Sequence, residues 1–217
     1  IAGLDHQESA AISAIATLSM PVDRQLIDQL PGLEIISSFG VGYDHIDAAY
    51  AASKGICVTH TPHVLDDEVA DTTIALLLNT VREFYTAEKY LRDGNWENKG
   101  NYPLTPLSMR GRVVGIFGLG RIGQTIARRL QGFDVEIHYH SRNQVAGVEY
   151  PYHATLLQLA QAVDTLIVVV PATSQTHHAI NAEILAALGE RGVLVNVGRG
   201  PVVDEAALIH ALENRII

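Results

Sequence analysis

Three glycines with the spacing GxGxxG occur at Gly118, Gly120 and Gly123. They follow the apolar run 113–117 and begin a helical pattern over residues 122–130. Gly118 would permit a tight turn, Gly120 would let the backbone approach a pyrophosphate, and Gly123 would let the helix pack closely on the strand. The first N–H groups of the helix would then face the phosphates. The position between a strand and a helix predicts dinucleotide binding; glycines that serve packing alone are the alternative.

The end of the next apolar run, 135–140, distinguishes between the two nicotinamide cofactors. A site specific for NAD places Asp or Glu there, where the carboxylate accepts a hydrogen bond from the ribose 2′-hydroxyl. This chain instead continues as His140-Ser141-Arg142, without a carboxylate. Ser141 can donate to a 2′-phosphate and Arg142 can pair with it. The sequence therefore predicts NADP(H) as the preferred cofactor, with NAD(H) as the other candidate, unless Arg142 is only a solvated loop residue.

Two further segments carry groups that suit a carboxylate. Arg199 follows the apolar run 193–197, and ligands of open parallel sheets bind beyond the carboxyl ends of the strands. A guanidinium there can hold a carboxylate through two hydrogen bonds and polarise an adjacent carbonyl, whereas a surface ion pair is the alternative. Residues 39–44 (FGVGYD) can expose consecutive backbone N–H groups as an anion nest, although an ordinary glycine turn explains them equally well.

Composition and charge disfavour several other classes of protein. The chain has 15 basic and 24 acidic residues, a net charge of −9, so we expect no nucleic-acid partner. We also expect no membrane span, because no apolar run reaches about 18 residues. None of the ten histidines has further ligands at a zinc spacing, so we predict no metal site. The single cysteine, Cys57, cannot form an internal disulfide, which suits a cytoplasmic protein.

Short apolar runs alternate with helical patterns along the chain, as is typical of a parallel sheet covered by helices. Strands are predicted at residues 13–18, 33–37, 56–59, 113–117, 135–140, 165–170 and 193–197. Helices are predicted at 23–30, 47–54, 122–130, 154–162, 182–188 and 204–212, the last two capped by Asn181 and Asp204. A longer helix is predicted over 66–92, with Val69, Ile74, Leu77, Val81 and Phe84 on its buried face. The last strand would leave an apolar sheet edge, so we expect a piece of a longer protein.

Five stretches in this order resemble the D-2-hydroxyacid dehydrogenase family. They are residues 40–47 (GVGYDHID), 61–71 (TPHVLDDEVAD), 114–123 (VGIFGLGRIG), 170–180 (VPATSQTHHAI) and 195–205 (VNVGRGPVVDE). The resemblance begins at about Ala14 and covers nearly the whole chain. Within the family, residues 140–142 (HSR) together with 89–96 (KYLRDGNW) are most similar to NADPH-preferring hydroxypyruvate and glyoxylate reductases.

The resemblance implies an architecture and a reaction. The fold would be a Rossmann-type doubly wound parallel sheet in residues 65–217 and a smaller flavodoxin-like α/β substrate domain in residues 1–64, both incomplete. The protein would be a homodimer that transfers a hydride from NADPH to a small 2-keto acid, giving a D-2-hydroxy acid. A related enzyme for phosphoglycerate, formate or phosphite is one alternative, and a non-catalytic NAD(P)-sensing protein is another.

The resemblance also implies roles for matching residues. The backbone amides of Val41 and Gly42 would bind the substrate carboxylate, and Arg199 would bind and polarise the keto acid. The implied cofactor contacts are Leu65 and Thr73 at the nicotinamide end, Gly118, Gly120, Arg121, Ile122 and Gly123 at the pyrophosphate, Ser141 and Arg142 at the 2′-phosphate, and Pro171, Thr176 and Val197 along the rest of the cofactor cleft. The family's histidine acid/base and its glutamate lie beyond a fifth strand and match no residue here. We therefore expect these 217 residues to bind cofactor without turnover.

Overall fold

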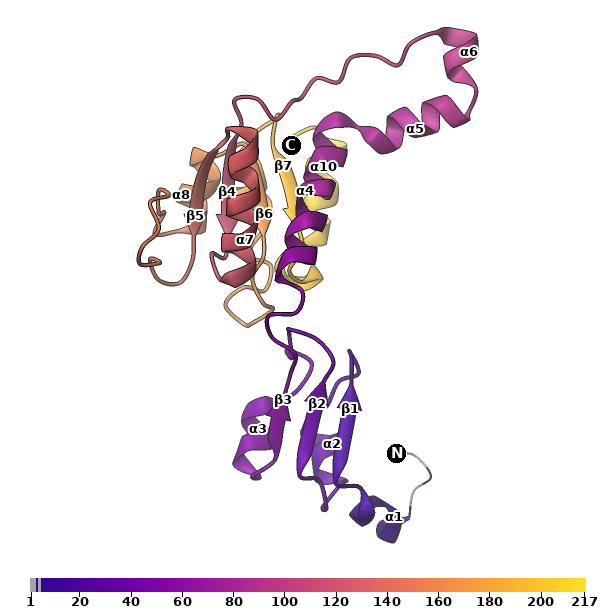
Figure 1. The fold of residues 1–217 in the computed structure, drawn as a ribbon, viewed down its shortest axis with the longest axis vertical. Coiled ribbons are helices and arrows are strands. Elements are labelled where there is room, and N and C mark those ends of the chain that lie inside the picture. The colour runs from indigo at the N-terminus through magenta and orange to yellow at the C-terminus, as the bar shows by residue number, and fades with distance from the viewer. Residues whose placement is uncertain (1–2, 4) are drawn as a thin grey trace. The chain divides into compact units, whose positions relative to one another are not determined.

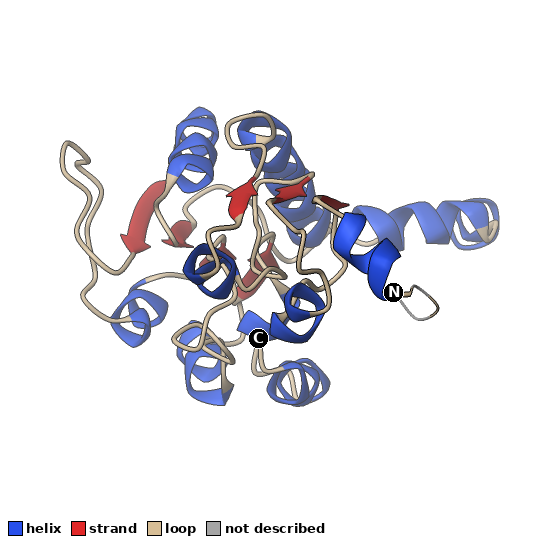
Figure 2. Cartoon of the chain, turned by 90° about the horizontal axis from the view of Figure 1, so that it is seen from below, coloured by secondary structure: helices blue, strands red, loops and turns tan. Residues whose placement is uncertain are grey.

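The computed structural model describes residue 3 and residues 5–217, and the chain divides into two compact units, Ile1–Leu65 and Asp66–Ile217. The first unit ends one residue after the boundary predicted at residue 64. Each unit is built on its own parallel sheet, and helices (blue) flank the strands (red) in Figure 2. The predicted α/β class with two parallel sheets is confirmed.

The first unit has a three-stranded sheet in the order β1-β2-β3. Its elements are α1 (His6–Ala11), β1 (Ala14–Thr17), α2 (Arg24–Asp28), β2 (Ile35–Ser38), α3 (Ala48–Ser53) and β3 (Cys57–Thr59). Asp23 and Asp47 begin α2 and α3, where their carboxylates accept hydrogen bonds from the amides of Leu26 and Tyr50. The core contains Val22, Ile27, Leu30, Leu33, Ile36, Ile46, Ala51 and Ile56. The sheet therefore presents residues 39–44 directly after the carboxyl end of β2.

The second unit has a four-stranded sheet in the order β5-β4-β6-β7 (Figure 1). Its strands are β4 (Val113–Phe117), β5 (Glu136–His140), β6 (Thr165–Val168) and β7 (Val193–Asn196). Its helices are α4 (Asp66–Arg82), α5 (Phe84–Arg92), α6 (Asn95–Lys99), α7 (Arg121–Leu130), α8 (Leu156–Ala162), α9 (Ala182–Leu188) and α10 (Glu205–Glu213), with 3-10 turns η1 (Gln131–Phe133) and η2 (Gly200–Val202). Because β5 and β6 lie on opposite sides of β4, the strand order reverses beside the glycine turn, where such sheets bind their ligands.

Both faces of this second sheet are covered by apolar packing, as a doubly wound fold requires. One core joins the sheet to α4 and α7 and includes Leu77, Ile116 and Ile126. The other joins the opposite face to α8, α9 and α10 and includes Leu159 and Leu185. The parallel sheet covered by helices that the alternating elements predict, and the Rossmann-type arrangement that the resemblance implies, are thereby confirmed. Asn181 and Asp204 cap α9 and α10 as predicted.

The prediction of one long helix over residues 66–92 is wrong, because the structure contains two helices there, α4 and α5. Glu83 separates them in the left-handed conformation, with φ 52° and ψ 38°, and such a residue ends the helical hydrogen-bond ladder. The Asn79 side chain accepts from the Tyr85 amide at 3.1 Å, and the Glu83 carboxylate accepts from the Tyr102 hydroxyl at 2.6 Å. Phe84, predicted on the buried face, is 54% exposed after this break.

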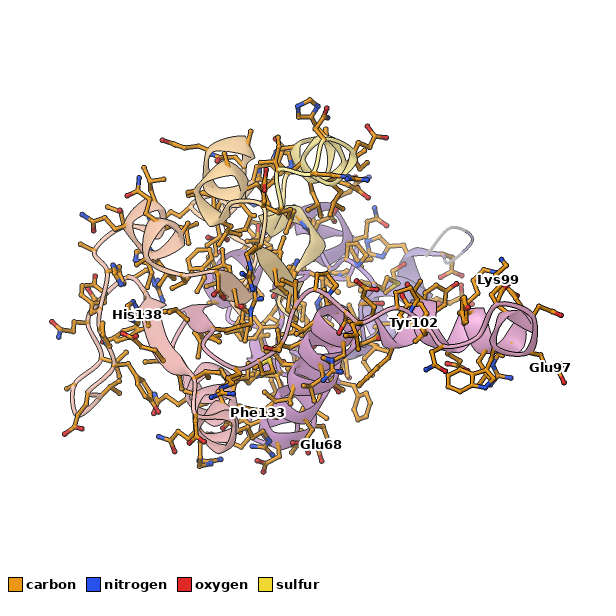
Figure 3. The ribbon with its side chains drawn as sticks, turned by 90° about the horizontal axis from the view of Figure 1, so that it is seen from above. Glu68, Glu97, Lys99, Tyr102, Phe133 and His138 are labelled. Carbon is orange, nitrogen blue, oxygen red and sulfur yellow. The ribbon has the colours of Figure 1, made fainter. Side chains whose placement is uncertain are left out.

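Helices α5 and α6 form an arm that extends from the sheet of the second unit (Figure 1). Glu97 and Lys99 lie at its far end, and Tyr102 lies on the return segment (Figure 3). The Tyr90 hydroxyl donates to the Gly100 carbonyl at 3.0 Å, which ties the return segment to α5. The large apolar side chains exposed between residues 84 and 104 are Phe84, Tyr85, Leu91, Trp96 and Leu104. No helix in the described part of the chain is both long and apolar enough to span a membrane.

Candidate functional site

The three glycines of the GxGxxG motif, which we call the glycine fingerprint, are required for different structural reasons. Gly118 has φ +106°, and a Cβ there would lie 2.8 Å from Cγ1 of Val170. A Cβ on Gly123 would lie 2.1 Å from the Gly118 carbonyl oxygen, because α7 packs directly on the turn. A Cβ on Gly120 would meet no heavy atom within 4 Å. The chain itself therefore requires Gly118 and Gly123, whereas the space at Gly120 is what a closely approaching pyrophosphate needs.

The amino end of α7 has the properties of an anion site. Gly120 caps this ten-residue helix without a side-chain hydrogen bond, and the first-turn amides belong to Arg121, Ile122 and Gly123. The Arg121 guanidinium lies 3.5 Å from the Asp66 carboxylate at the start of α4. At the other end of α7, Arg129 pairs with two acidic residues of α4. These ion pairs and the shared core hold α7 against α4, so the position of its amino end is well defined.

The end of β5 lies beside the glycine turn. His140 pairs with Phe117 across the two strands, and the Gly118 amide donates to the His140 carbonyl at 2.9 Å. Ser141 follows directly, and its hydroxyl donates to the Asn143 carbonyl at 2.7 Å. Arg142 is exposed, and residues 141–148 contain no Asp or Glu. The exposed Arg142 guanidinium and the Ser141 hydroxyl, which would have to turn from Asn143 to donate elsewhere, thus follow β5 without a carboxylate nearby in sequence, which suits a 2′-phosphate.

The loops after β6 and β7 complete this edge of the sheet. The Val197 amide donates to the Val168 carbonyl at 3.0 Å, which extends the pairing of β7 with β6. The Thr176 hydroxyl donates to the Pro171 carbonyl at 2.7 Å and accepts from the Thr173 amide at 2.8 Å. Pro171 and Thr176 therefore belong to one closed turn. Because all four strands are parallel, the predicted cofactor residues that follow them gather at one edge of the sheet.

Arg199 lies one turn beyond β7. The Asn196 side chain accepts from the Gly198 amide at 3.0 Å and donates to the Arg199 carbonyl at 3.0 Å. The Arg199 guanidinium is half-buried and donates to the Gly198 carbonyl at 3.0 Å. A Cβ on Gly198 would lie 2.6 Å from the Val170 carbonyl oxygen, so this turn packs directly against the end of β6. This constraint on Gly198 was not predicted from the sequence.

Val41 and Gly42 lie in the first unit, in the loop after β2. The Gly40 carbonyl accepts from the Thr61 amide at 3.0 Å, and Nδ1 of His60 lies 3.0 Å from the Val41 carbonyl oxygen. The Tyr43 ring lies 5.0 Å from the His60 ring. Within residues 5–217, the Val41 and Gly42 amides have no hydrogen-bond acceptor. These contacts hold the loop while leaving both N–H groups available to an anion.

Two predicted cofactor contacts remain, Leu65 as the last residue of the first unit and Thr73 in α4 of the second. Leu65 is 42% exposed, so its side chain is accessible. Thr73 is fully buried in α4, and its hydroxyl donates to the Val69 carbonyl at 2.7 Å. The structure therefore gives Thr73 a partner in its own helix and no exposed surface, and its role stays a prediction. Among the described residues there is no group of three potential metal ligands.

Comparison with known proteins defines the family. Residues 74–217 match the family described as D-isomer specific 2-hydroxyacid dehydrogenase, NAD binding domain. The chain belongs to this family, which confirms the resemblance predicted from the five stretches.

Several similar proteins are named as reductases. The chain is 44% identical over 209 residues to glyoxylate/hydroxypyruvate reductase A of Arabidopsis thaliana, covering 96% of this chain and 66% of the relative. It is also 44% identical over 206 residues to hydroxyphenylpyruvate reductase of Plectranthus scutellarioides, covering 95% and 65%. An NADPH-dependent glyoxylate/hydroxypyruvate reductase from Sinorhizobium meliloti, solved with NADP and malonate, has a TM-score of 0.95 and 53% identity, covering 100% of this chain and 67% of that one. The chain spans about two thirds of the length of these relatives.

Proposed function

We propose that the full-length protein reduces a small 2-keto acid, hydroxypyruvate or glyoxylate, to a D-2-hydroxy acid with NADPH. The observation that carries this proposal is a glycine turn beside which strand β5 is followed by Ser141-Arg142, with no Asp or Glu in residues 141–148. The similarity to NADPH-dependent glyoxylate/hydroxypyruvate reductases supports it.

The residues of the second unit would hold the cofactor, which supplies the hydride when bound. Gly120 would let the pyrophosphate approach the first-turn amides of α7, where the helix dipole favours negative charge. Ser141 and Arg142 would donate to the 2′-phosphate. The closed turn that contains Pro171 and Thr176 would line the remaining edge together with Val197. Leu65 is proposed at the nicotinamide end because it precedes α4 and is exposed.

The keto acid would be bound by two kinds of donor. We propose that the unpaired amides of Val41 and Gly42 bind its carboxylate. We propose that Arg199 also binds the acid and polarises the 2-keto oxygen, where negative charge develops during hydride transfer. Fixing the carboxylate orients the carbonyl carbon toward the hydride donor. We assign the proton donor to none of the described histidines.

Turnover by the full-length protein tests the proposed reaction. Loss of reduced nicotinamide would be followed by absorbance with hydroxypyruvate and glyoxylate, each with NADPH and with NADH. Hydroxyphenylpyruvate belongs in the same panel, because one of the two 44% identical relatives is a reductase of that name. We expect faster turnover with NADPH and the small keto acids. Reduction of NAD(P)+ by phosphoglycerate, formate or phosphite, without reduction of any keto acid by NADPH or NADH, would contradict the proposed substrate. Cofactor binding without any turnover would favour a sensor.

The cofactor preference yields a separate prediction. Arg142→Ala should lower the affinity for NADPH about tenfold, since an exposed charge-assisted hydrogen bond to the 2′-phosphate is lost. The affinity for NADH should stay unchanged, because NADH has no such phosphate. Fluorescence titration with both cofactors measures the two constants. Arg128→Ala is the matched control, because Arg128 is an equally exposed arginine in the last turn of α7. Equal losses for both cofactors would contradict the assignment of Arg142.

We also propose that the protein is a homodimer and that the arm of α5 and α6 contributes to the interface. Trp96 on this arm is 53% exposed and Leu104 on its return segment is 97% exposed, so burial against a second copy would remove apolar surface from water. Leu104→Glu should therefore raise the dimer dissociation constant at least about tenfold, as measured by sedimentation equilibrium. Ile209→Glu, at a 51% exposed position on α10, is the control. A dimer of unchanged strength in Leu104→Glu would contradict the proposed interface.

The cytoplasmic location stays a prediction.

A further inference from the structure

The loop that begins with Ser141-Arg142 returns to the strand from which it came. Residues 141–153 form this loop, which we call loop 141–153. The Tyr139 amide donates to the Pro151 carbonyl at 3.0 Å, and the His153 amide donates to the Tyr139 carbonyl at 2.9 Å. Tyr139 and Tyr152 thereby form a parallel bridge. Both ends of loop 141–153 therefore meet at β5.

A chain of side chains reinforces this return. Nε2 of His138 lies 2.8 Å from the Glu136 carboxylate, and Nδ1 of His138 lies 3.0 Å from Nε2 of His153. Figure 3 labels His138 on β5. Because a carboxylate only accepts, Nε2 of neutral His138 carries the hydrogen, and Nδ1 must accept from Nε2–H of His153. The pair is therefore matched when both imidazoles are neutral.

His153 also contacts the residue that precedes Ser141. Nδ1 of His140 lies 2.9 Å from the His153 carbonyl oxygen, so this nitrogen carries a hydrogen and donates. The His140 ring lies 5.5 Å from the Phe117 ring and is nearly parallel to it, directly before the glycine turn. The Tyr152 hydroxyl donates to the Ser141 carbonyl at 3.3 Å. One end of loop 141–153 thus sets the position of the other through His153 and its neighbour.

We propose that His153 is a positioning residue for NADPH selectivity. Through its hydrogen bonds to His138 and His140, it holds loop 141–153 so that Ser141 and Arg142 can meet the 2′-phosphate. This inference rests on the proposed function, because it takes the 2′-phosphate site at these two residues as given. NADH makes no contact through a 2′-phosphate, so the effect of His153 should be specific to NADPH.

The hydrogen bond between the two imidazoles makes this positioning dependent on pH. When the pair binds one proton, one of the two facing nitrogens still donates to the other and the hydrogen bond remains. When both rings are protonated, both facing nitrogens are donors and the two charged rings repel each other. Burial lowers the pKa of His153, and the neighbouring His138 and His140 lower it further. Glu136 is the acidic group on this face of β5, whereas α8 and the paired residues of β4 carry no titratable side chain.

The sign of the pH effect follows from the lowered pKa. The folded state binds a proton on His153 less readily than an unfolded chain, whose histidine pKa is about 6.5. The contact is therefore fully present above about pH 6.5 and is lost as pH falls below that value. The selectivity for NADPH over NADH should decrease over the same range.

Two substitutions at one position test the inference. His153→Leu removes the donor to His138, and it should raise the dissociation constant for NADPH about tenfold while changing that for NADH less than about twofold. His153→Gln keeps an N–H near the same place but does not titrate. It should therefore preserve NADPH affinity at neutral pH and retain more of that affinity at acid pH than the wild type. His210→Gln, an exposed histidine on α10, is the control.

The measurement is fluorescence titration of the full-length protein with each cofactor, without substrate, from about pH 5.5 to 8. The 2′-phosphate itself gains a proton near pH 6, so the difference between wild type and His153→Gln isolates the histidine contribution. Without cofactor, the backbone amides of residues 139 and 153 should exchange hydrogen faster in His153→Leu than in the wild type.

Several outcomes separate this inference from the proposed function. Equal losses of NADPH and NADH affinity in His153→Leu, or identical pH profiles for wild type and His153→Gln, would overturn the role of His153. If Arg142→Ala lowers NADPH affinity and His153→Leu does not, only the present inference fails. If Arg142→Ala leaves NADPH affinity unchanged, both the proposed 2′-phosphate site and the inference about His153 fail.

Discussion

Arg199→Ala in the full-length protein should lower kcat/KM for the keto acid by about two to three orders of magnitude, or about 2.7–4 kcal/mol, as for a lost oxyanion donor. The guanidinium would bind the carboxylate and stabilise charge on the carbonyl oxygen, and alanine can do neither. Alanine also removes the hydrogen bond from the guanidinium to the Gly198 carbonyl, but the backbone of the turn keeps its contact with Asn196 and the packing of Gly198 on Val170. Steady-state kinetics with hydroxypyruvate and glyoxylate measures the loss.

Arg199→Lys is the companion variant for this prediction. Lysine keeps the positive charge but cannot form two parallel hydrogen bonds, so its kcat/KM should lie between those of wild type and Arg199→Ala. The dissociation constant for NADPH should stay unchanged in both variants, because Arg199 is proposed to act on the keto acid. Normal catalytic efficiency in Arg199→Ala, or a loss that follows a loss of cofactor affinity, would contradict this role.

Alanine at two positions of the glycine fingerprint should affect two different properties, the stability of the fold at Gly123 and cofactor binding at Gly120. Gly123→Ala should destabilise the protein by at least about 1–3 kcal/mol, because its Cβ would lie 2.1 Å from the Gly118 carbonyl oxygen and α7 would have to move away from the turn. Gly120→Ala should leave the free energy of unfolding nearly unchanged, since its Cβ meets no heavy atom within 4 Å. It should nevertheless weaken NADPH and NADH binding at least about tenfold, because the methyl group would occupy the space of the pyrophosphate.

Denaturant unfolding and cofactor titration together check this pair. Gly132→Ala is the control, because a Cβ there also meets no heavy atom within 4 Å and the residue lies in η1. It should leave cofactor binding unchanged and stabilise the protein by about 0.4–1 kcal/mol, through the lower conformational entropy of the unfolded chain. A Gly120→Ala protein with normal affinity for both cofactors would show that the open space at Gly120 is not the pyrophosphate site.

Much of the fold was predictable because its signals are local. The apolar runs that became β4, β6 and β7 lie where the sequence pattern placed them, and Asn181 and Asp204 begin helices as predicted. Caps and apolar periodicity depend on residues within a few positions of one another, so they are readable without the tertiary structure. The family was also predictable, since five motifs in order are specific to it.

The break in the long helix was not predictable in this way. Residues 66–92 carry a helical pattern without Gly or Pro, and Glu83 is not a residue type that signals a left-handed turn. Its partner Tyr102 lies 19 positions away in the sequence. The short helix α6 was not predicted either, because Gly94 and Gly100 lie at its two ends and glycine disfavours a helix.

The sequence by itself determined the two parallel α/β units, the dinucleotide-binding turn and the family. The tertiary structure alone decided that Gly198 packs against Val170, that Thr73 is buried, and that His153 returns to contact His138. The physical reason is the range of the interactions. Periodicity, caps and turn glycines act over a few residues, whereas the space beside Gly120 and the imidazole pair depend on segments brought together by packing of the sheet and its helices.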